Sequence, residues 1–210
     1  MEIKLRLEEE KDYRAVEELT RESFWNIHSP GADEHFLVHN MRQTKEFVKS
    51  LDFVAIYNGK IVGNIVYAES RIISLGNEQV VLTFGPVSVL PEYQKNGIGA
   101  MLINHTIKLA RQMSYKAILI YGDPEYYKKY GFIASKKYSI TNKDGKFPAA
   151  LLVLELYPNA LDGIRGVFDE GHAYQINAEE AAEFDKGFPV KEKFKTESQD
   201  KFLEISAKYL

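Results

Sequence analysis

The sequence contains no cysteine. Without thiols the chain can form no disulfide bond, thiolate zinc site or iron–sulfur cluster, and it has no cysteine nucleophile. No stretch of about 18 apolar residues occurs, and the start of the chain lacks the apolar run of a secretory signal. We therefore expect a cytoplasmic protein that does not cross a membrane.

The sequence also lacks an excess of basic residues. It holds 27 Lys and Arg against 30 Asp and Glu in 210 residues, a net charge of −3 that does not favour nucleic-acid binding. Residues 158–210 carry 7 basic and 11 acidic residues, which leaves 20 and 19 for residues 1–157. This shift at Pro158 predicts one domain over residues 1–157 and a C-terminal extension over 158–210. Because no Gly- or Ser-rich linker separates them, we expect the extension, a strand and two helices, to dock on the domain.

Apolar periodicity predicts a mixed α/β chain with many neighbouring strands. Asn58-Gly59 lies between two apolar runs and is a strong hairpin signal, so the first part of the sheet should be antiparallel. The predicted strands cover residues 3–7, 53–57, 61–73, 80–89, 117–121 and 149–157. The predicted helices cover residues 13–24, 33–48, 97–113, 124–131, 177–187 and 196–209.

Polar residues mark several of the predicted helix starts. Asp12, Asp33 and Asn177 are of the types that accept hydrogen bonds from the first free amides of a helix. Thr196 with Gln199 has the spacing of a capping box. We therefore expect side-chain caps at all four helices.

The segment before the predicted helix at 97–113 is the most informative one. A helix start presents unpaired N–H groups and the positive end of the helix dipole, and so it binds anions. Gly97 and Gly99 allow close approach, Lys95 adds a positive charge, Gln94 adds a donor, and no acidic residue intervenes. This loop predicts a phosphate site that needs no metal, although an ordinary strand–loop–helix connection has the same glycines.

A dinucleotide-binding fold is the other interpretation of this glycine-rich loop. Asp123 follows the next strand, where a ribose-binding acid would lie. However, Leu102 occupies the position of the third glycine, and the connection between Val89 and Gly97 is long for that tight turn. The antiparallel hairpin before it also disfavours this fold.

Two motifs together resemble the GNAT N-acetyltransferases. Gln94-x-x-Gly97-x-Gly99-Ala100 matches the coenzyme A pyrophosphate loop of that family, whose pattern is Q/R-x-x-G-x-G/A. After the next strand comes a run that resembles the family's second, aromatic signature, Tyr126-Tyr127-Lys128-Lys129-Tyr130-Gly131-Phe132. Gly122-Asp123-Pro124 before it resembles one bacterial branch of predicted acetyltransferases. The resemblance covers residues 1–157 and implies a central, mostly antiparallel mixed sheet flanked by helices.

The resemblance implies acetyl-coenzyme A as co-substrate and transfer of its acetyl group to a primary amine through a ternary complex. Tyr127 matches the family's general acid, although a tyrosine that only packs would have the same surroundings. Gly85-Pro86 inside the strand predicts a bulge that frees backbone groups for the pantetheine arm. The implied cofactor-binding residues are Val87, Ser88, Val89, Gln94, Lys95, Asn96, Gly97, Ile98, Gly99 and Ala100.

The general base is open. The family's glutamate on the central strand falls on Thr83, and a threonine cannot act as a base. Glu69, His28, Glu34 and His35 are candidates, and a water relay is another.

The acceptor is expected to be a small-molecule or peptide amine. Trp25, His28, Glu34 and His35 lie where the family lines its acceptor pocket, and an aromatic ring beside carboxylates suits a cationic amine. A core role for Trp25 is the alternative. His28 and His35 have no third ligand spaced near them, so we predict no metal.

A non-catalytic module that senses acyl-coenzyme A is the second functional hypothesis. The extension over residues 158–210 could close the acceptor pocket as a lid, which favours an enzyme, or form a homodimer surface, which favours the module. We expect neither nucleic acid nor membrane as a partner.

Overall fold

A nine-stranded sheet organises the computed structural model, which describes residues 1–210. The main path runs β1-β2-β3-β4-β5-β8-β6, and β9 pairs with β3 and β7. All pairs are antiparallel except β4 with β5 and β7 with β9, which confirms the mixed, mostly antiparallel sheet. The strands are β1 (Lys4–Leu7), β2 (Phe53–Tyr57), β3 (Lys60–Ser74), β4 (Asn77–Val89), β5 (Ala117–Tyr121), β6 (Ile133–Ala134), β7 (Ile140–Thr141), β8 (Leu151–Glu155) and β9 (Gly166–Asp169).

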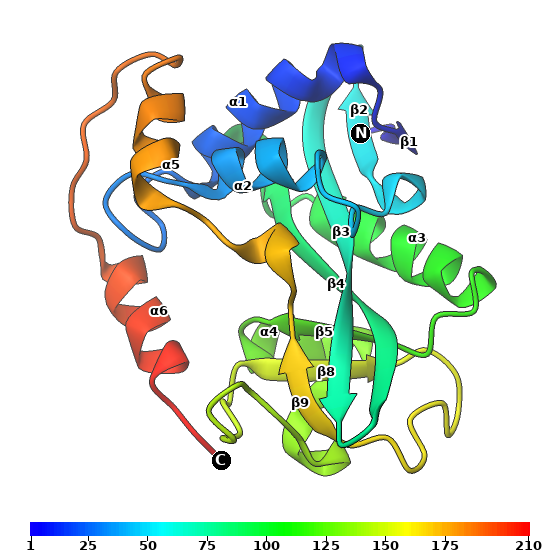
Figure 1. The fold of residues 1–210 in the computed structure, drawn as a ribbon. Helices are drawn as coiled ribbons and strands as arrows, with labels where there is room; N and C mark the ends of the chain where they lie inside the picture. The colour runs from blue at the N-terminus through cyan, green and yellow to red at the C-terminus, as the bar shows by residue number, and fades with distance from the viewer.

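Helices cover both faces of this sheet (Figure 1). Side chains alternate between faces along a strand. Val54 and Val66 therefore pack with the helix pair α1 and α2, whereas Phe53 and Ile65 pack with α3 on the other face. No helix is long and apolar enough to span a membrane. The helices are α1 (Tyr13–Phe24), α2 (Glu34–Met41), α3 (Ile98–Gln112), α4 (Pro124–Tyr127), α5 (Ala178–Asp185) and α6 (Glu197–Ser206).

The predicted strands and helices are present, and the main boundary error lies after α2. That helix ends at Met41 and does not continue to residue 48. The following segment bonds to β3 instead: the amide of Val48 donates to Tyr67 O at 2.9 Å, and Phe47 bridges to Ala68. Pairing with the sheet edge therefore replaces the last helical turns. The two-residue strands β6 and β7 were not predicted.

One of the four predicted caps is present. Asn177 Oδ1 accepts hydrogen bonds from the amides of Glu179 and Glu180, at 2.9 and 3.2 Å. Asp12 instead pairs with Arg6 in a preceding turn, and Asp33 makes no side-chain cap.

The predicted capping box at α6 is wrong because both side chains bind another part of the chain. Thr196 Oγ1 and Gln199 Nε2 donate to the carbonyl of Asn26, at 2.7 and 3.1 Å. The loop after α1 thus holds the start of α6 in place.

The predicted bulge at Gly85-Pro86 is confirmed. Ile65 lies opposite Val87, and Tyr67 lies opposite Phe84, so two β4 residues face one β3 residue. On its other side, β4 pairs with β5 at one position, Leu82 with Ile118. Beyond that point the two parallel strands separate, which opens the sheet between them.

The C-terminal extension docks on this framework. Its strand β9 pairs with β3, and Asp185 at the end of α5 binds the buried Arg21 of α1 at 2.6 Å. Residues 186–196, which we call the strap, link α5 to α6 along one side of the molecule (Figure 1). The chain end closes on residues 147–149, where the amide of Leu210 donates to Phe147 O at 2.9 Å.

Candidate active site

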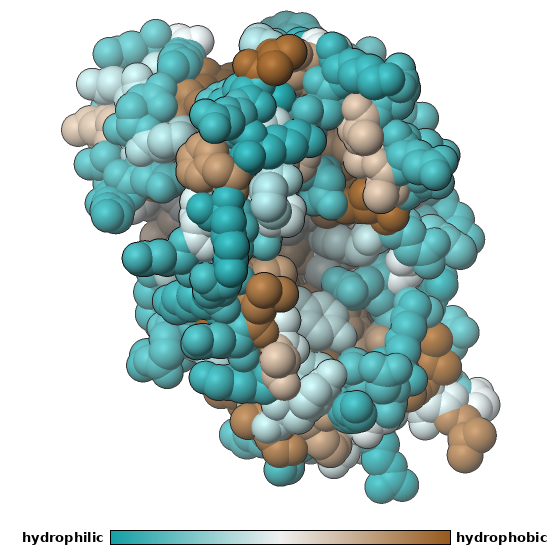
Figure 2. All heavy atoms as spheres, turned by 90° about the vertical axis from the view of Figure 1, so that its left-hand side faces the viewer, coloured by the Kyte–Doolittle hydropathy of each residue, from teal (hydrophilic) through white to brown (hydrophobic).

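A cavity of about 1210 Å³ lies where β4 and β5 separate. One end, which we call the cofactor end after the sequence-based expectation, is bounded by β4 and the start of α3, and lining residues there include Val87, Val89, Gln94, Lys95, Gly97, Ile98, Gly99 and Ala100. The other end, called the acceptor end for the same reason, is bounded by the α1–α2 loop, the segment after β9 and α6, and includes His28, Glu34, Glu170, Tyr174, Phe202 and Ile205. Figure 2 shows the side that carries α5, the strap and α6, where the surface is mainly hydrophilic and apolar side chains form small separate groups. Because Glu170, Tyr174 and α6 belong to the extension, the extension supplies a wall of the cavity.

The loop before α3 has the backbone of an anion site. Gly97 is the N-cap with φ 81°, a left-handed conformation that glycine adopts without strain. The amide of Met101 donates to Gly97 O at 3.0 Å, so the amides of the three residues before Met101 have no partner within the helix. Eight of the ten predicted cofactor residues line the cavity here.

Ser88 and Asn96 do not line the cavity. The Ser88 side chain is buried and donates to Thr20 Oγ1 at 3.0 Å. Asn96 Nδ2 turns back to the carbonyl of Tyr93 at 3.2 Å. Gln94 lines the cavity, but its Nε2 donates to Val89 O at 3.0 Å, so this side chain braces the loop.

Tyr127 at the end of α4 lines the cavity between the two ends. Its ring packs on Phe84 and Phe132, with centroids 5.9 and 5.7 Å away. Burial raises the pKa of Tyr127 well above its usual value, and the hydroxyl has no hydrogen-bond partner in the chain. The phenol is therefore protonated at neutral pH and free to donate.

Gly122 makes room for this ring. A Cβ at position 122 would lie 2.4 Å from Cε2 of Tyr127 and 2.6 Å from its Cδ2. The glycine before α4 thus fixes how closely the tyrosine approaches the end of β5.

Thr83 lies on β4 and lines the same cavity. It is buried, and its Oγ1 lies 2.8 Å from Ser70 Oγ. No carboxylate of β4 lines the cavity, so this strand offers no general base.

His28 and Glu34 are brought together at the acceptor end. His28 Nδ1 lies 2.8 Å from Glu34 Oε1, and the imidazole stacks on Phe202 of α6 with centroids 4.4 Å apart. The α1–α2 loop and the extension therefore meet at this pair.

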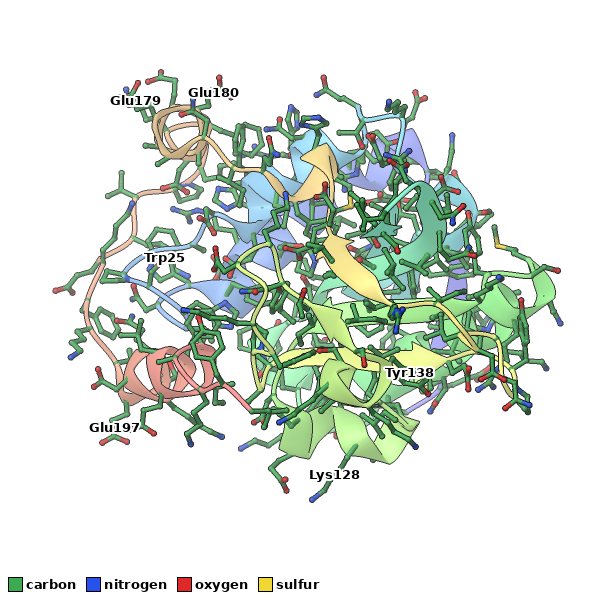
Figure 3. The ribbon with its side chains drawn as sticks, turned by 60° about the horizontal axis from the view of Figure 1, so that its bottom comes forward. Trp25, Lys128, Tyr138, Glu179, Glu180 and Glu197 are labelled. Carbon is green, nitrogen blue, oxygen red and sulfur yellow. The ribbon has the colours of Figure 1, made fainter.

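Trp25, His35 and Glu69 do not line the cavity, contrary to the sequence-based expectation. Trp25 lies between α1 and the strap (Figure 3), and its Nε1 donates to Glu192 O at 2.9 Å. His35 is fully buried against Phe184 and Phe188 of α5 and the loop after it, and burial lowers its pKa to about 4.

Glu69 points to the opposite face of the sheet. It accepts a hydrogen bond from Tyr115 Oη at 2.6 Å, beside the end of α3. Because side chains alternate along β3, this direction is opposite to that of Ala68, the cross-strand neighbour of Thr83.

Sequence reasoning missed two polar residues that follow β9. Glu170 and Tyr174 line the acceptor end. Burial raises the pKa of Glu170 to about 7, and the buried Tyr174 Oη has no hydrogen-bond partner. The acidic character of residues 158–210 was the available signal, and it did not single out one carboxylate.

Comparison with known proteins finds similarity to acetyltransferases. Residues 49–134 match the model of the acetyltransferase (GNAT) domain. The chain is 24% identical over 166 residues to the N-acetyltransferase YhbS of Escherichia coli. This match covers 79% of this chain and 94% of that protein. It is 29% identical over 96 residues to the N-acetyltransferase YjhQ of E. coli. This match covers 46% of this chain and 53% of that protein, so the chain spans about half the length of this relative.

Solved structures have the same fold. The crystal structure of E. coli YhbS in complex with CoA matches with a TM-score of 0.72 at 22% identity, over 83% of this chain and 93% of that one. A GNAT family acetyltransferase from Brucella melitensis in complex with acetyl-CoA matches with a TM-score of 0.67 at 25% identity, over 83% and 99%. With the two motifs and the separated strands, these matches define a GNAT-type acyltransferase fold. These matches identify residues 49–134 as a GNAT acetyltransferase domain, and the chain is similar to N-acetyltransferases over most of its length.

Proposed function

We propose that this chain transfers the acetyl group of acetyl-coenzyme A to a primary amine through a ternary complex, with Tyr127 as general acid. The observation that carries the proposal is one continuous cavity that joins the free amides at the start of α3 to the unpartnered hydroxyl of Tyr127. The acetyl-CoA and CoA complexes of two proteins with this fold also support it.

The residues of the first end fit coenzyme A. The diphosphate would lie on the amides of Ile98, Gly99 and Ala100, where the helix dipole favours negative charge and Lys95 adds a cation. Beyond Leu82 the edge of β4 is not paired with β5, so its backbone groups can bond to the pantetheine amides as an added strand would.

The thioester supplies an acyl carbon that an amine can attack and a thiol that can leave. The protein holds both reactants in one cavity, which removes much of the entropic barrier. Tyr127 donates its phenolic proton to the departing sulfur. Since burial disfavours the phenolate, this tyrosine regains a proton after each turnover.

The second end of the cavity suits a cationic amine. Glu34, Asp123 and Glu170 line it, and α6 covers it with Phe202 and Ile205 beside the polar Ser198, Lys201 and Ser206. Carboxylates in a covered site attract a protonated amine, and the cover limits the access of bulk water to the thioester.

Calorimetric titration with acetyl-coenzyme A, followed by a thiol-release assay, tests the proposal. The amine panel is ethylamine, benzylamine, putrescine, lysine and glycylglycine. Binding with thiol release on at least one amine supports transfer. Binding without release would instead favour the acyl-coenzyme A sensor, and no binding would refute both functions.

Tyr127→Phe tests the general acid. We expect turnover to fall by about 10²-fold or more, as for loss of a general acid, while acetyl-coenzyme A binding changes little. Tyr138→Phe is the matched control, because Tyr138 packs outside the cavity and should not affect turnover. Wild-type turnover in Tyr127→Phe at every pH would exclude the assigned role.

A further inference from the structure

Glu170 is an acid without a partner. It follows β9, which pairs with β3, and its carboxylate makes no hydrogen bond or ion pair within the chain. The adjacent Asp169 is fully engaged, at 2.8 Å from Lys143 Nζ and 2.9 Å from the amide of Gly171. One of two consecutive acids thus stabilises the turn after β9, while the other faces the cavity.

Two tyrosines share the end of the cavity that holds Glu170. Tyr121 at the end of β5 and Tyr174 after β9 line the same end of the cavity, and the pKa of each is raised by burial and by the charge of Glu170. Burial likewise raises the pKa of Glu170, with Asp169 acting in the same direction and Lys143 against it. The Tyr174 hydroxyl is buried without a partner, so an acceptor and a donor are both left unused in one place.

We propose that Glu170 is the general base that takes the proton of the acceptor ammonium group, with Tyr174 Oη hydrogen-bonded to the same nitrogen. This assignment rests on the proposed function and names the base that Thr83 cannot provide. It places the base on the C-terminal extension, outside the strand and loop that hold the cofactor.

The other acids of the cavity are already in use. Glu34 is paired with His28 at 2.8 Å and accepts from the amide of Asp33 at 3.2 Å. Asp123 Oδ1 accepts from the amide of Glu125 at 2.9 Å as the N-cap of α4, and Asp123 Oδ2 lies 3.5 Å from Lys201 Nζ. Glu170 is therefore the carboxylate of the cavity that can receive a proton without breaking an existing hydrogen bond or ion pair.

The proton transfers of the proposed acetyl transfer balance with Glu170 as base and Tyr127 as acid. Glu170 removes one proton from the ammonium nitrogen, whose lone pair then forms the C–N bond to the acetyl carbon. The C–S bond breaks, and its electron pair takes the proton of Tyr127. The new amide nitrogen loses a second proton, which restores Tyr127, and Glu170 releases its proton to solvent.

The pH dependence of turnover separates this role from a structural one. The base must be ionised, so kcat/KM of the wild type should rise as pH increases toward the pKa of Glu170, about 7. Above that pH the rise should become less steep, which gives a bend in the pH profile. Glu170→Gln should lower kcat/KM by about 10²- to 10⁴-fold, the range for a general base, and remove that bend from the profile. The loss should shrink at high pH, where more of the amine is already neutral.

The assay uses the full chain and the panel amine that gives the fastest thiol release. Glu69→Gln is the matched control, because Glu69 is a half-buried glutamate on the other face of the sheet. Calorimetry with acetyl-coenzyme A shows whether each variant is folded. If Glu170→Gln does not bind acetyl-coenzyme A, Glu170→Asp replaces it, and we expect that variant to keep the bend at reduced rate.

The outcomes separate the two proposals. Wild-type rate and pH profile in a folded Glu170→Gln would overturn the base assignment and leave the proposed function intact, and so would an Asp variant without the bend. A wild-type protein that releases no thiol with any panel amine would overturn the proposed function and this assignment with it.

Discussion

Gly122→Ala should impair the proposed catalysis without removing the hydroxyl of Tyr127. The new Cβ would lie 2.4 Å from the Tyr127 ring, where ordinary carbon contacts lie at about 3.5–4.0 Å, so the ring must move by about 1 Å. Misplacement of a reacting group by about 1 Å can cost about 10²-fold in rate. We therefore expect kcat to fall by about 10²-fold while acetyl-coenzyme A binding changes little.

The cost in stability should be small by comparison. Gly122 does not have a positive φ, so alanine brings no backbone strain, and overpacking of this kind costs about 1–3 kcal/mol. The reduced freedom of the unfolded chain offsets about 0.4–1 kcal/mol of that. Urea unfolding should show a net loss of about 1–2 kcal/mol.

Thiol release under saturating acetyl-coenzyme A is the assay, and a double variant makes it specific. If the loss arises through Tyr127, adding Gly122→Ala to Tyr127→Phe should cause little further loss, because both changes remove one interaction. Gly187→Ala is the control. It also lacks a positive φ, and its Cβ would contact the Phe184 carbonyl at 3.3 Å, outside the cavity. Full turnover in Gly122→Ala, or additive losses in the double variant, would refute the reasoning.

Three further perturbations test the loop, the docked extension and a buried histidine. Gly97→Glu should abolish acetyl-coenzyme A binding by calorimetry, whereas Gly76→Glu, with a similar φ of 80° in an exposed turn, should not. Asp185→Ala should lower the free energy of unfolding in urea by about 3–5 kcal/mol, because Arg21 is left buried and unpaired, and should shift the fluorescence of the single tryptophan at the strap. For His35 the folded pKa of about 4 lies below the usual 6.5, so the unfolded state binds more protons between these values. Stability should therefore fall by about 3 kcal/mol as pH drops from 6.5 to 4, with a smaller slope in His35→Gln.

The parts of the fold that depend on local chemistry could be predicted from the sequence. Asn58-Gly59 forms a turn because its neighbours on both sides are apolar runs that pair as strands. Gly85-Pro86 forms a bulge because proline cannot donate to a ladder. The Gly97 cap follows from a backbone conformation that favours glycine. Each of these features is determined by a few adjacent residues.

Side-chain direction at the acceptor end could not be predicted, because it depends on distant partners. Trp25 and His35 lie in the expected segment, but the strap and α5 cover them. Glu69 comes one residue after Ala68, the neighbour of Thr83, so its side chain points to the face of β3 away from the side that Thr83 shares. Glu170 follows a strand of four residues that exists because β3 extends beyond β2 and offers a free edge.

The cavity is therefore assembled from two sources that differ in how far the sequence determines them. The cofactor end is built from β4, the following loop and α4, which are contiguous and rich in local signals. The acceptor end is closed by the extension, through Glu170, Tyr174 and α6, held by long-range contacts such as Gln199 to Asn26. Substitutions in the two parts should accordingly have different kinetic effects. Changes in the loop before α3 should act on the Kd of acetyl-coenzyme A, and changes on α6 should act on the KM of the amine. Because the extension lines the acceptor end, the proposed function makes it the part of the chain that would set which amine is acetylated.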